Sequence, residues 1–187
     1  MIGKVIMYNF KQKGKRNMRT ETTTRTLYTF DELSEEAKGK AIEGLYDLNV
    51  FFDWWDGVYE DAKEIGLKIE SFDLGRHQIE GRFTQSAEDV AQAIIKDHGP
   101  DCETFKTATK FLKDLEGSRR AWAIMNPDEV DNEPDTDEEL EKEFLQSLLE
   151  DYRIMLRQEY EYLTSDEAII ESIKANEYEF TEDGKLR

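Results

Sequence analysis

The sequence predicts an α+β fold, with a small, mainly antiparallel sheet covered by several helices and one long C-terminal helix. Three observations support this fold class. Short segments with alternating apolar residues occur at 26–30, 67–72, 79–83 and 178–180. The segments between them repeat apolar residues every three or four positions, as helices do. The longest of these carries a broad apolar stripe from Leu140 to Leu163. Ten Phe, eight Tyr and three Trp also indicate a folded chain rather than a disordered acidic one.

The first 25 residues differ in charge from the rest of the chain. They hold seven Lys/Arg and one acidic residue, whereas the remainder holds 18 Lys/Arg and 42 Asp/Glu. We therefore predict a basic N-terminal tail at 1–25 and a single α+β domain at 26–187, a length that can bury a core without disulfides or metals. A body with a net charge of −24 repels nucleic acids and membrane surfaces but attracts basic proteins.

The first half of the domain is predicted to contain two helices and a hairpin. Ser34 precedes two glutamates and is expected to cap a helix. Phe51, Trp55 and Ile65 belong to one apolar face of a second helix, after which Gly75 separates two alternating segments, as in a β-hairpin. Adjacent residues lie about 100° apart on a helix, so only one of the neighbouring tryptophans at 54 and 55 is expected to face the core.

Helix-start signals continue through the second half. Ser86 with Asp89 resembles a capping box, and a further helix is expected to end at Gly117. Residues 117–136 lack any apolar period and are predicted to be an acidic loop. The long helix follows, and Ser165 is expected to cap a short one. An Asp-Gly turn at 183–184 then follows a last strand, which is expected to pair with 26–30 or with the hairpin.

Two segments resemble a family of small, largely uncharacterised phage and prophage proteins, some of which are labelled antitoxins. The first is Tyr-Thr-Phe-Asp-Glu-Leu-Ser-Glu-Glu-Ala-Lys at 28–38, and the second is Asn-Glu-Tyr-Glu-Phe at 176–180 with Asp-Gly at 183–184. The resemblance covers about 26–75 and 140–187. It implies a mobile-element gene expressed in a bacterial cell, and it brings no catalytic residues.

Residues typical of catalytic or metal sites are few. His98 and Cys102 are four positions apart, but Gly99 and Pro100 between them break the helix that would aim both at one ion. No Gly-rich phosphate loop or dinucleotide motif is present. Asp53 and Asp56 beside the tryptophans are the best carboxylate pair for a hydrolase, although two acids that simply face water are the stronger interpretation. We therefore predict no metal, no cofactor and no catalytic residue.

The acidic stretch is the best functional candidate. Residues 128–151 hold twelve acids and one lysine. Glu139 and Glu143 lie one helical turn apart, about 6 Å, which resembles the spacing of successive phosphates along a nucleic acid strand. The alternative is a solvated face that keeps the protein soluble. The predicted partner-binding residues are Trp122, Asp128, Glu129, Asp131, Glu133, Asp135, Asp137, Glu138, Glu139 and Glu143.

These observations lead to three functional hypotheses. The first is a phage-type acidic binding protein that occupies the basic surface of a bacterial nucleic-acid-handling or defence system. The second is an antitoxin-like or scaffold protein that binds by apolar shape, including a homodimer through Leu145, Leu149 or Leu156 of the long helix. The third is a hydrolase that uses Asp53 and Asp56. A single cysteine favours the reducing cytoplasm of the host cell.

Overall fold

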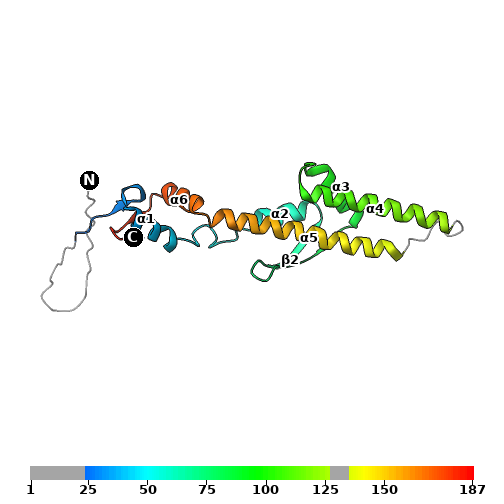
Figure 1. The fold of residues 1–187 in the computed structure, drawn as a ribbon, viewed down its shortest axis with the longest axis horizontal. Coiled ribbons are helices and arrows are strands. Elements are labelled where there is room, and N and C mark those ends of the chain that lie inside the picture. Colours follow the sequence, from blue (N-terminus) through cyan, green and yellow to red (C-terminus); the bar gives the residue numbers. More distant parts are fainter. Residues whose placement is uncertain (1–23, 127–134) are drawn as a thin grey trace, which may run out of the picture. The chain divides into compact units, whose positions relative to one another are not determined.

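The computed structural model describes residues 24–126 and 135–187, and it confirms the α+β fold class (Figure 1). The predicted basic tail lies almost wholly outside these residues. The elements are, in chain order, β1 (Tyr28–Thr29), the 3-10 helix η1 (Phe30–Glu32), α1 (Glu35–Gly44), α2 (Asp56–Glu64), β2 (Leu67–Asp73), β3 (Gln78–Phe83), α3 (Ala87–Asp97), α4 (Glu103–Met125), α5 (Asp135–Leu163), α6 (Asp166–Ala175) and β4 (Glu179–Phe180).

Contacts divide the chain into two compact units, where the sequence predicts one domain. Unit 1 is Met1–Phe52 with Tyr162–Arg187, and unit 2 is Asp53–Glu161. Each has its own buried cluster and its own two-stranded antiparallel sheet. The prediction of one four-stranded sheet is therefore wrong, because β1 pairs with β4 and β2 pairs with β3. Among the strands of residues 24–126 and 135–187, each of the two sheets therefore has two members.

Unit 1 is built on the pairing of its two chain segments. Tyr28 lies opposite Phe180 in an antiparallel ladder, which confirms that the last strand joins the first. Two predicted caps are present: Ser34 Oγ accepts a hydrogen bond from the Ala37 N–H, and Ser165 Oγ does the same at the start of α6. The buried side chains of this unit are Phe30, Leu33, Ala37, Ala41, Ile169, Ile173 and Phe180.

The C-terminal turn closes tightly onto α1. The Gly184 N–H donates to the Thr181 carbonyl, and Leu186 forms a β-bridge with Phe180, as the Asp-Gly signal predicts. Gly184 has φ of +83°, a conformation that glycine adopts without strain. A Cβ at this position would collide with the Ala37 carbonyl oxygen, so the backbone of α1 occupies the space that a side chain would need.

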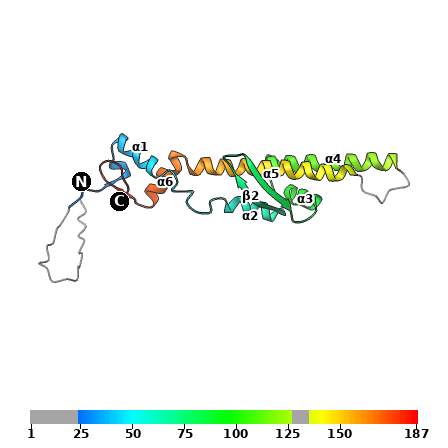
Figure 2. The same ribbon diagram turned by 90° about the horizontal axis from the view of Figure 1, so that it is seen from below.

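Unit 2 contains the predicted hairpin, whose strands cross α5 (Figure 2). Leu67 pairs with Phe83 and Ile69 with Gly81, with a bulge before Ser71. A Cβ added at Gly81 would lie 2.7 Å from the Lys68 carbonyl oxygen and 2.9 Å from a Leu149 methyl group. Glycine at this position therefore allows α5 to approach the sheet closely.

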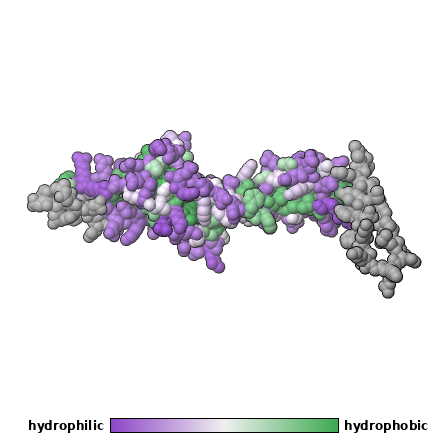
Figure 3. Space-filling view, turned by 180° about the vertical axis from the view of Figure 1, so that it is seen from behind, coloured by the Kyte–Doolittle hydropathy of each residue, from purple (hydrophilic) through white to green (hydrophobic). Residues whose placement is uncertain are grey.

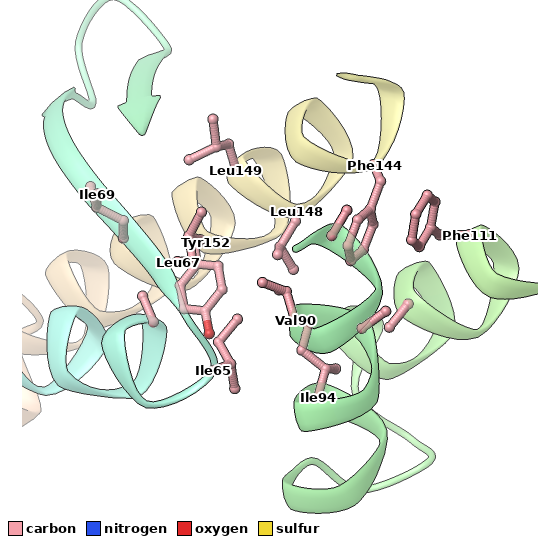
Figure 4. Close-up of a cluster of buried hydrophobic side chains, with 14 of the residues drawn as sticks. Ile65, Leu67, Ile69, Val90, Ile94, Phe111, Phe144, Leu148, Leu149 and Tyr152 are labelled. Atoms are coloured by element: carbon pink, nitrogen blue, oxygen red, sulfur yellow. The ribbon is translucent and has the colours of Figure 1, made fainter. Parts of the chain in front are cut away.

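Helices α2 to α5 and the hairpin share one core, which Figure 4 shows in close-up. Tyr152 is fully buried among aliphatic side chains of the hairpin, α2 and α3, and its hydroxyl points toward α2. Phe111 of α4 stacks on Phe144 of α5 with ring centroids 4.3 Å apart. Ser86 caps α3 by accepting a hydrogen bond from the Asp89 N–H, as predicted. The long helix and its inward leucines are therefore confirmed.

The predicted start of the tryptophan helix is wrong. Helix α2 begins at Asp56, and Phe51 before it is 90% exposed instead of buried. Trp54 and Trp55 both precede the regular helix and are both half-buried, so the 100° argument does not apply to them. Their rings pack on Phe72 of the hairpin, with centroid distances of 5.8 and 5.7 Å.

The predicted helix end at Gly117 is also wrong, because α4 continues to Met125. A glycine inside a helix costs about 1 kcal/mol relative to alanine, which tertiary contacts can offset. Here Ser118 and Arg119 hydrogen-bond to Thr136 and Asp137 of α5. The predicted loop at 117–136 is thus shortened from both ends, and 127–134 lie outside the described residues. Among the described helices, none has the length and apolarity needed to cross a bilayer.

Candidate acidic interface on the long helix

The structure describes about half of the predicted partner-binding residues. Asp128, Glu129, Asp131 and Glu133 lie outside the described chain, as does the side chain of Asp135 at the start of α5. The others lie on the antiparallel pair formed by α4 and α5, which run side by side in Figures 1 and 2. Trp122 is on α4, and Asp137, Glu138, Glu139 and Glu143 are on α5.

Glu138, Glu139 and Glu143 are exposed on the first three turns of α5. Glu139 and Glu143 are one turn apart on one face, as predicted. Within 135–143 the sequence holds six acids and one lysine, so this end of the helix is strongly negative. Hydrophilic residues cover most of the face of unit 2 that Figure 3 shows. These three carboxylates are therefore positioned to meet cations from outside the protein.

Asp137 differs from its neighbours because it is buried. It is 4% exposed, its carboxylate accepts from Arg119 Nε at 2.8 Å, and Ser118 Oγ donates to it at 3.2 Å. Arg119 also reaches Glu88 of α3 at 2.8 Å. The hydrogen bond to Asp137 is the main reason that the pKa of Arg119 is raised. Asp137 thus ties α5 to α4 and α3 and does not belong to the exposed acidic surface.

Removing the charge of Arg119 is expected to destabilise unit 2. Arg119→Met leaves the buried Asp137 carboxylate without its cation, and we expect a loss of about 2 kcal/mol, because Arg119 itself is partly exposed. The double variant with Asp137→Asn should recover most of this loss. Urea unfolding followed by circular dichroism measures both. Lys110→Met, which breaks an exposed pair with Asp114, is the control and should cost under about 0.5 kcal/mol. If Arg119→Met and Lys110→Met lowered the free energy of unfolding equally, the interpretation of Arg119–Asp137 as a buried ion pair would be contradicted.

Trp122 lies one helical turn beyond Ser118 and is half-buried. Its indole Nε1 is buried and has no hydrogen-bond acceptor within the part of the chain that the structure describes. A buried N–H without an acceptor costs about 1–3 kcal/mol. Trp122, one of the predicted partner-binding residues, therefore carries a buried indole N–H that lacks an acceptor in the described chain.

A polar cluster that the sequence did not reveal lies inside unit 2. His98 Nδ1 is 2.7 Å from Thr104 Oγ1, and its Nε2 is 3.6 Å from an Asp61 oxygen. The Tyr152 hydroxyl donates to the other Asp61 oxygen at 2.7 Å. The positions 61, 98, 104 and 152 share no spacing, so only the fold brings them together.

This Asp-His-Thr arrangement resembles a nucleophilic triad in residue types only. A nucleophile must reach a substrate, whereas Thr104 is 3% exposed and Tyr152 is fully buried. Burial also raises the pKa of Tyr152, which keeps its hydroxyl protonated as a donor. One hydrogen bond of this cluster therefore joins the end of α3 to α4, and another joins α5 to α2, while the Thr104 and Tyr152 hydroxyls are too buried to meet a substrate.

The structure also places the other candidates that the sequence suggested. Asp53 and Asp56 are both exposed, whereas the acid pair of a hydrolase flanks a bound sugar. Cys102 is exposed at the start of α4, while His98 turns toward Thr104. No group of three His, Cys, Asp or Glu side chains among the described residues could hold a metal ion.

The proposed dimer leucines are used within the protein's own core. Leu149 is 8% exposed and belongs to the core of unit 2, and Leu156 is fully buried. Leu145 is partly buried against the same core as Leu149. A second copy could reach Leu149 and Leu156 only by opening the protein, whereas part of Leu145 is accessible.

The described surface includes the following hollows. One of about 580 Å³ is lined by Glu88, Arg119, Arg120 and residues of α4, and one of about 530 Å³ lies between α1 and the C-terminal turn of unit 1. A third, of about 110 Å³ between α4 and α5, is smaller than ligand sites usually are. In the wall of the first hollow, Glu88 and Arg119 form an ion pair with each other.

No protein-family model, curated protein or solved structure matches this chain. The resemblance to phage proteins therefore rests on the two sequence segments described above.

Proposed function

We propose that this chain is an acidic binding protein of phage type, which inhibits a bacterial nucleic-acid-handling or defence protein by occupying its basic surface. The observation that carries the proposal is the group of three exposed carboxylates, Glu138, Glu139 and Glu143, on the first turns of a rigid helix. Arginine and lysine side chains that grip phosphates pair with carboxylates in much the same way. The resemblance to phage proteins supports a target in the bacterial cell.

The rigidity of α5 matters for this mechanism. Phe144 and Leu148 are buried one turn apart on the opposite side of the helix, and Asp137 is tied to α4. The helix that carries the exposed carboxylates is therefore ordered before binding. Binding then costs less conformational entropy than it would if a flexible acidic chain had to become ordered. Pre-organised charge of this kind raises both affinity and association rate.

Competition with DNA tests the proposal. A panel of purified basic bacterial DNA-binding proteins is loaded with a fluorescent duplex, and release of the duplex is measured as the chain is added. We expect release from at least one protein, weakened by raising salt from about 0.1 M to about 0.5 M. Reversing Glu138, Glu139 and Glu143 to Lys should raise the half-maximal concentration at least tenfold, a loss of about 1.4 kcal/mol.

A matched reversal separates the site from net charge alone. Glu167, Glu171 and Glu182 are exposed in unit 1, and changing them to Lys alters the charge of the chain by the same amount. This variant should release the duplex at nearly the concentration of the unmodified protein. Equal weakening by both triple reversals would sink the site assignment, and no release from any protein in the panel would sink the proposed function.

A further inference from the structure

The small hollow between α4 and α5 has an apolar inner part. Phe111 and Phe144 line it and are almost fully buried, so their stacked rings form its floor (Figure 4). Leu140 adds an aliphatic side chain to the wall. The volume of about 110 Å³ is well below the roughly 300 Å³ at which small-molecule pockets begin. The hollow therefore suits a single side chain of a protein partner rather than a cofactor.

Carboxylates surround the outer part of this hollow. Asp114 and Glu143 line it from the two opposite helices. Asp151 lies beside it, because its carboxylate accepts a hydrogen bond at 2.7 Å from Thr107, another lining residue. The pKa of Asp151 is raised, chiefly by burial and further by the negative charges of neighbouring glutamates. A positive charge placed in the hollow would relieve this repulsion.

The cation that the chain itself supplies balances only part of this charge. Lys110 Nζ donates to Asp114 at 2.7 Å, and the lysine side chain is 74% exposed. The hydrogen bond to Asp114 is the main reason that the pKa of Lys110 is raised, and the charge of Glu143 across the groove contributes. The next lysine toward the start of α4, Lys106, is paired with Glu103. Three carboxylates thus share one ammonium group, so charge complementarity favours a further cation in the hollow.

We propose that this hollow binds one arginine side chain of a protein partner, with its methylene groups on Phe111 and Phe144 and its guanidinium between Glu143 and Asp114. A planar guanidinium has several N–H donors, so it can pair with two carboxylates at once and also pack against aromatic rings. Lysine carries a compact, strongly hydrated charge and fits such a half-apolar site less well. The inference rests on the proposed function, because it assigns to Glu143 of the acidic interface one arginine of the partner's basic surface.

Three short peptides test the inference. They are identical and uncharged except for a central arginine, lysine or citrulline, the last being a neutral analogue of arginine with nearly the same shape. We expect the full chain to bind the arginine peptide about tenfold more tightly than the citrulline peptide, because charge-assisted hydrogen bonds are lost. The lysine peptide should be intermediate. Titrations followed in ¹H–¹⁵N spectra measure the affinities, and the amides of Thr107, Phe111 and Ser147 should shift most.

Two variants locate the contact. Glu143→Gln keeps the shape of the side chain and removes one carboxylate, so the ratio of arginine to citrulline affinity should fall from about 10 to about 2. Glu116→Gln removes the same charge at an exposed position of α4 that does not line this hollow, and it should keep the ratio. Ser147→Leu fills the hollow from an exposed position without changing any charge. It should abolish the nuclear Overhauser effects expected between the arginine methylenes and the rings of Phe111 and Phe144.

The outcomes that contradict the inference are distinct. Equal affinities for the arginine and citrulline peptides would overturn it, because the carboxylates would then contribute nothing. A ratio that survives Glu143→Gln, or ring contacts that persist in Ser147→Leu, would place the arginine elsewhere on the protein. Equal affinities for arginine and lysine would rule out recognition of the guanidinium. Failure to compete with DNA, by contrast, bears on the proposed function and leaves these peptide ratios unaffected.

Discussion

Replacing Tyr152 with alanine is expected to lower the free energy of unfolding by about 4 kcal/mol, because a large aromatic side chain leaves a packed core. Tyr152 is fully buried among hairpin, α2 and α3 side chains, and its hydroxyl donates to Asp61. The cavity cannot collapse easily, since the surrounding residues come from four different elements. Urea unfolding followed by circular dichroism measures the loss.

The variant Tyr152→Phe separates the ring from the hydroxyl. It keeps the packing and removes one hydrogen bond, and the Asp61 side chain is 39% exposed, so water can replace the lost donor. We expect a loss of about 1 kcal/mol. Ile154→Ala, at an exposed position of the same helix, should change stability by under about 0.5 kcal/mol. If alanine and phenylalanine at 152 cost the same, the packing argument is wrong.

Replacing Gly184 with alanine is expected to destabilise unit 1 by about 3 kcal/mol. Two penalties combine here. A positive φ costs a residue with a Cβ about 1–2 kcal/mol, and the new methyl group would collide with the Ala37 carbonyl oxygen, which belongs to the backbone of α1. The turn would have to move away from α1. Amide hydrogen exchange of residues in β4 and α1 measures the loss within unit 1.

Gly39→Ala provides a control of opposite sign in the same unit. Gly39 lies inside α1, and a Cβ there would meet nothing within 4 Å. Alanine should therefore stabilise the helix by about 0.5–1 kcal/mol. If Gly39→Ala and Gly184→Ala shift exchange in the same direction, the close approach of the turn to α1 does not determine stability.

The burial of Asp137 affects how the acidic interface is tested. Reversing Asp137 to Lys would place a second cation beside Arg119 inside the protein, so any loss of binding could come from loss of structure. Glu138, Glu139 and Glu143 are exposed, and their reversal changes the surface without disturbing this buried pair. The site hypothesis is therefore tested on three of the ten residues that the sequence suggested.

Local signals in the sequence determined most elements of the fold. The caps at Ser34, Ser86 and Ser165, the hairpin around Gly75 and the C-terminal Asp-Gly turn depend on neighbouring residues, and all are present. The long amphipathic helix was also predictable, because apolar residues recur with helical spacing from Leu140 to Leu163, which is too long for a strand. The exposed carboxylates of α5 followed from the same stripe, since they lie on its opposite side.

Only the tertiary structure decided the features that depend on distant residues. Helix α4 passes through Gly117 because α5 supplies partners for the residues after it, and Asp137 is buried because Arg119 neutralises it. The pairing of β1 with β4 and the hydrogen bond from Tyr152 to Asp61 join residues that are 91 or more positions apart. The physical reason is that burial and pairing are properties of the packed chain, whereas capping and periodicity are encoded within a few consecutive residues.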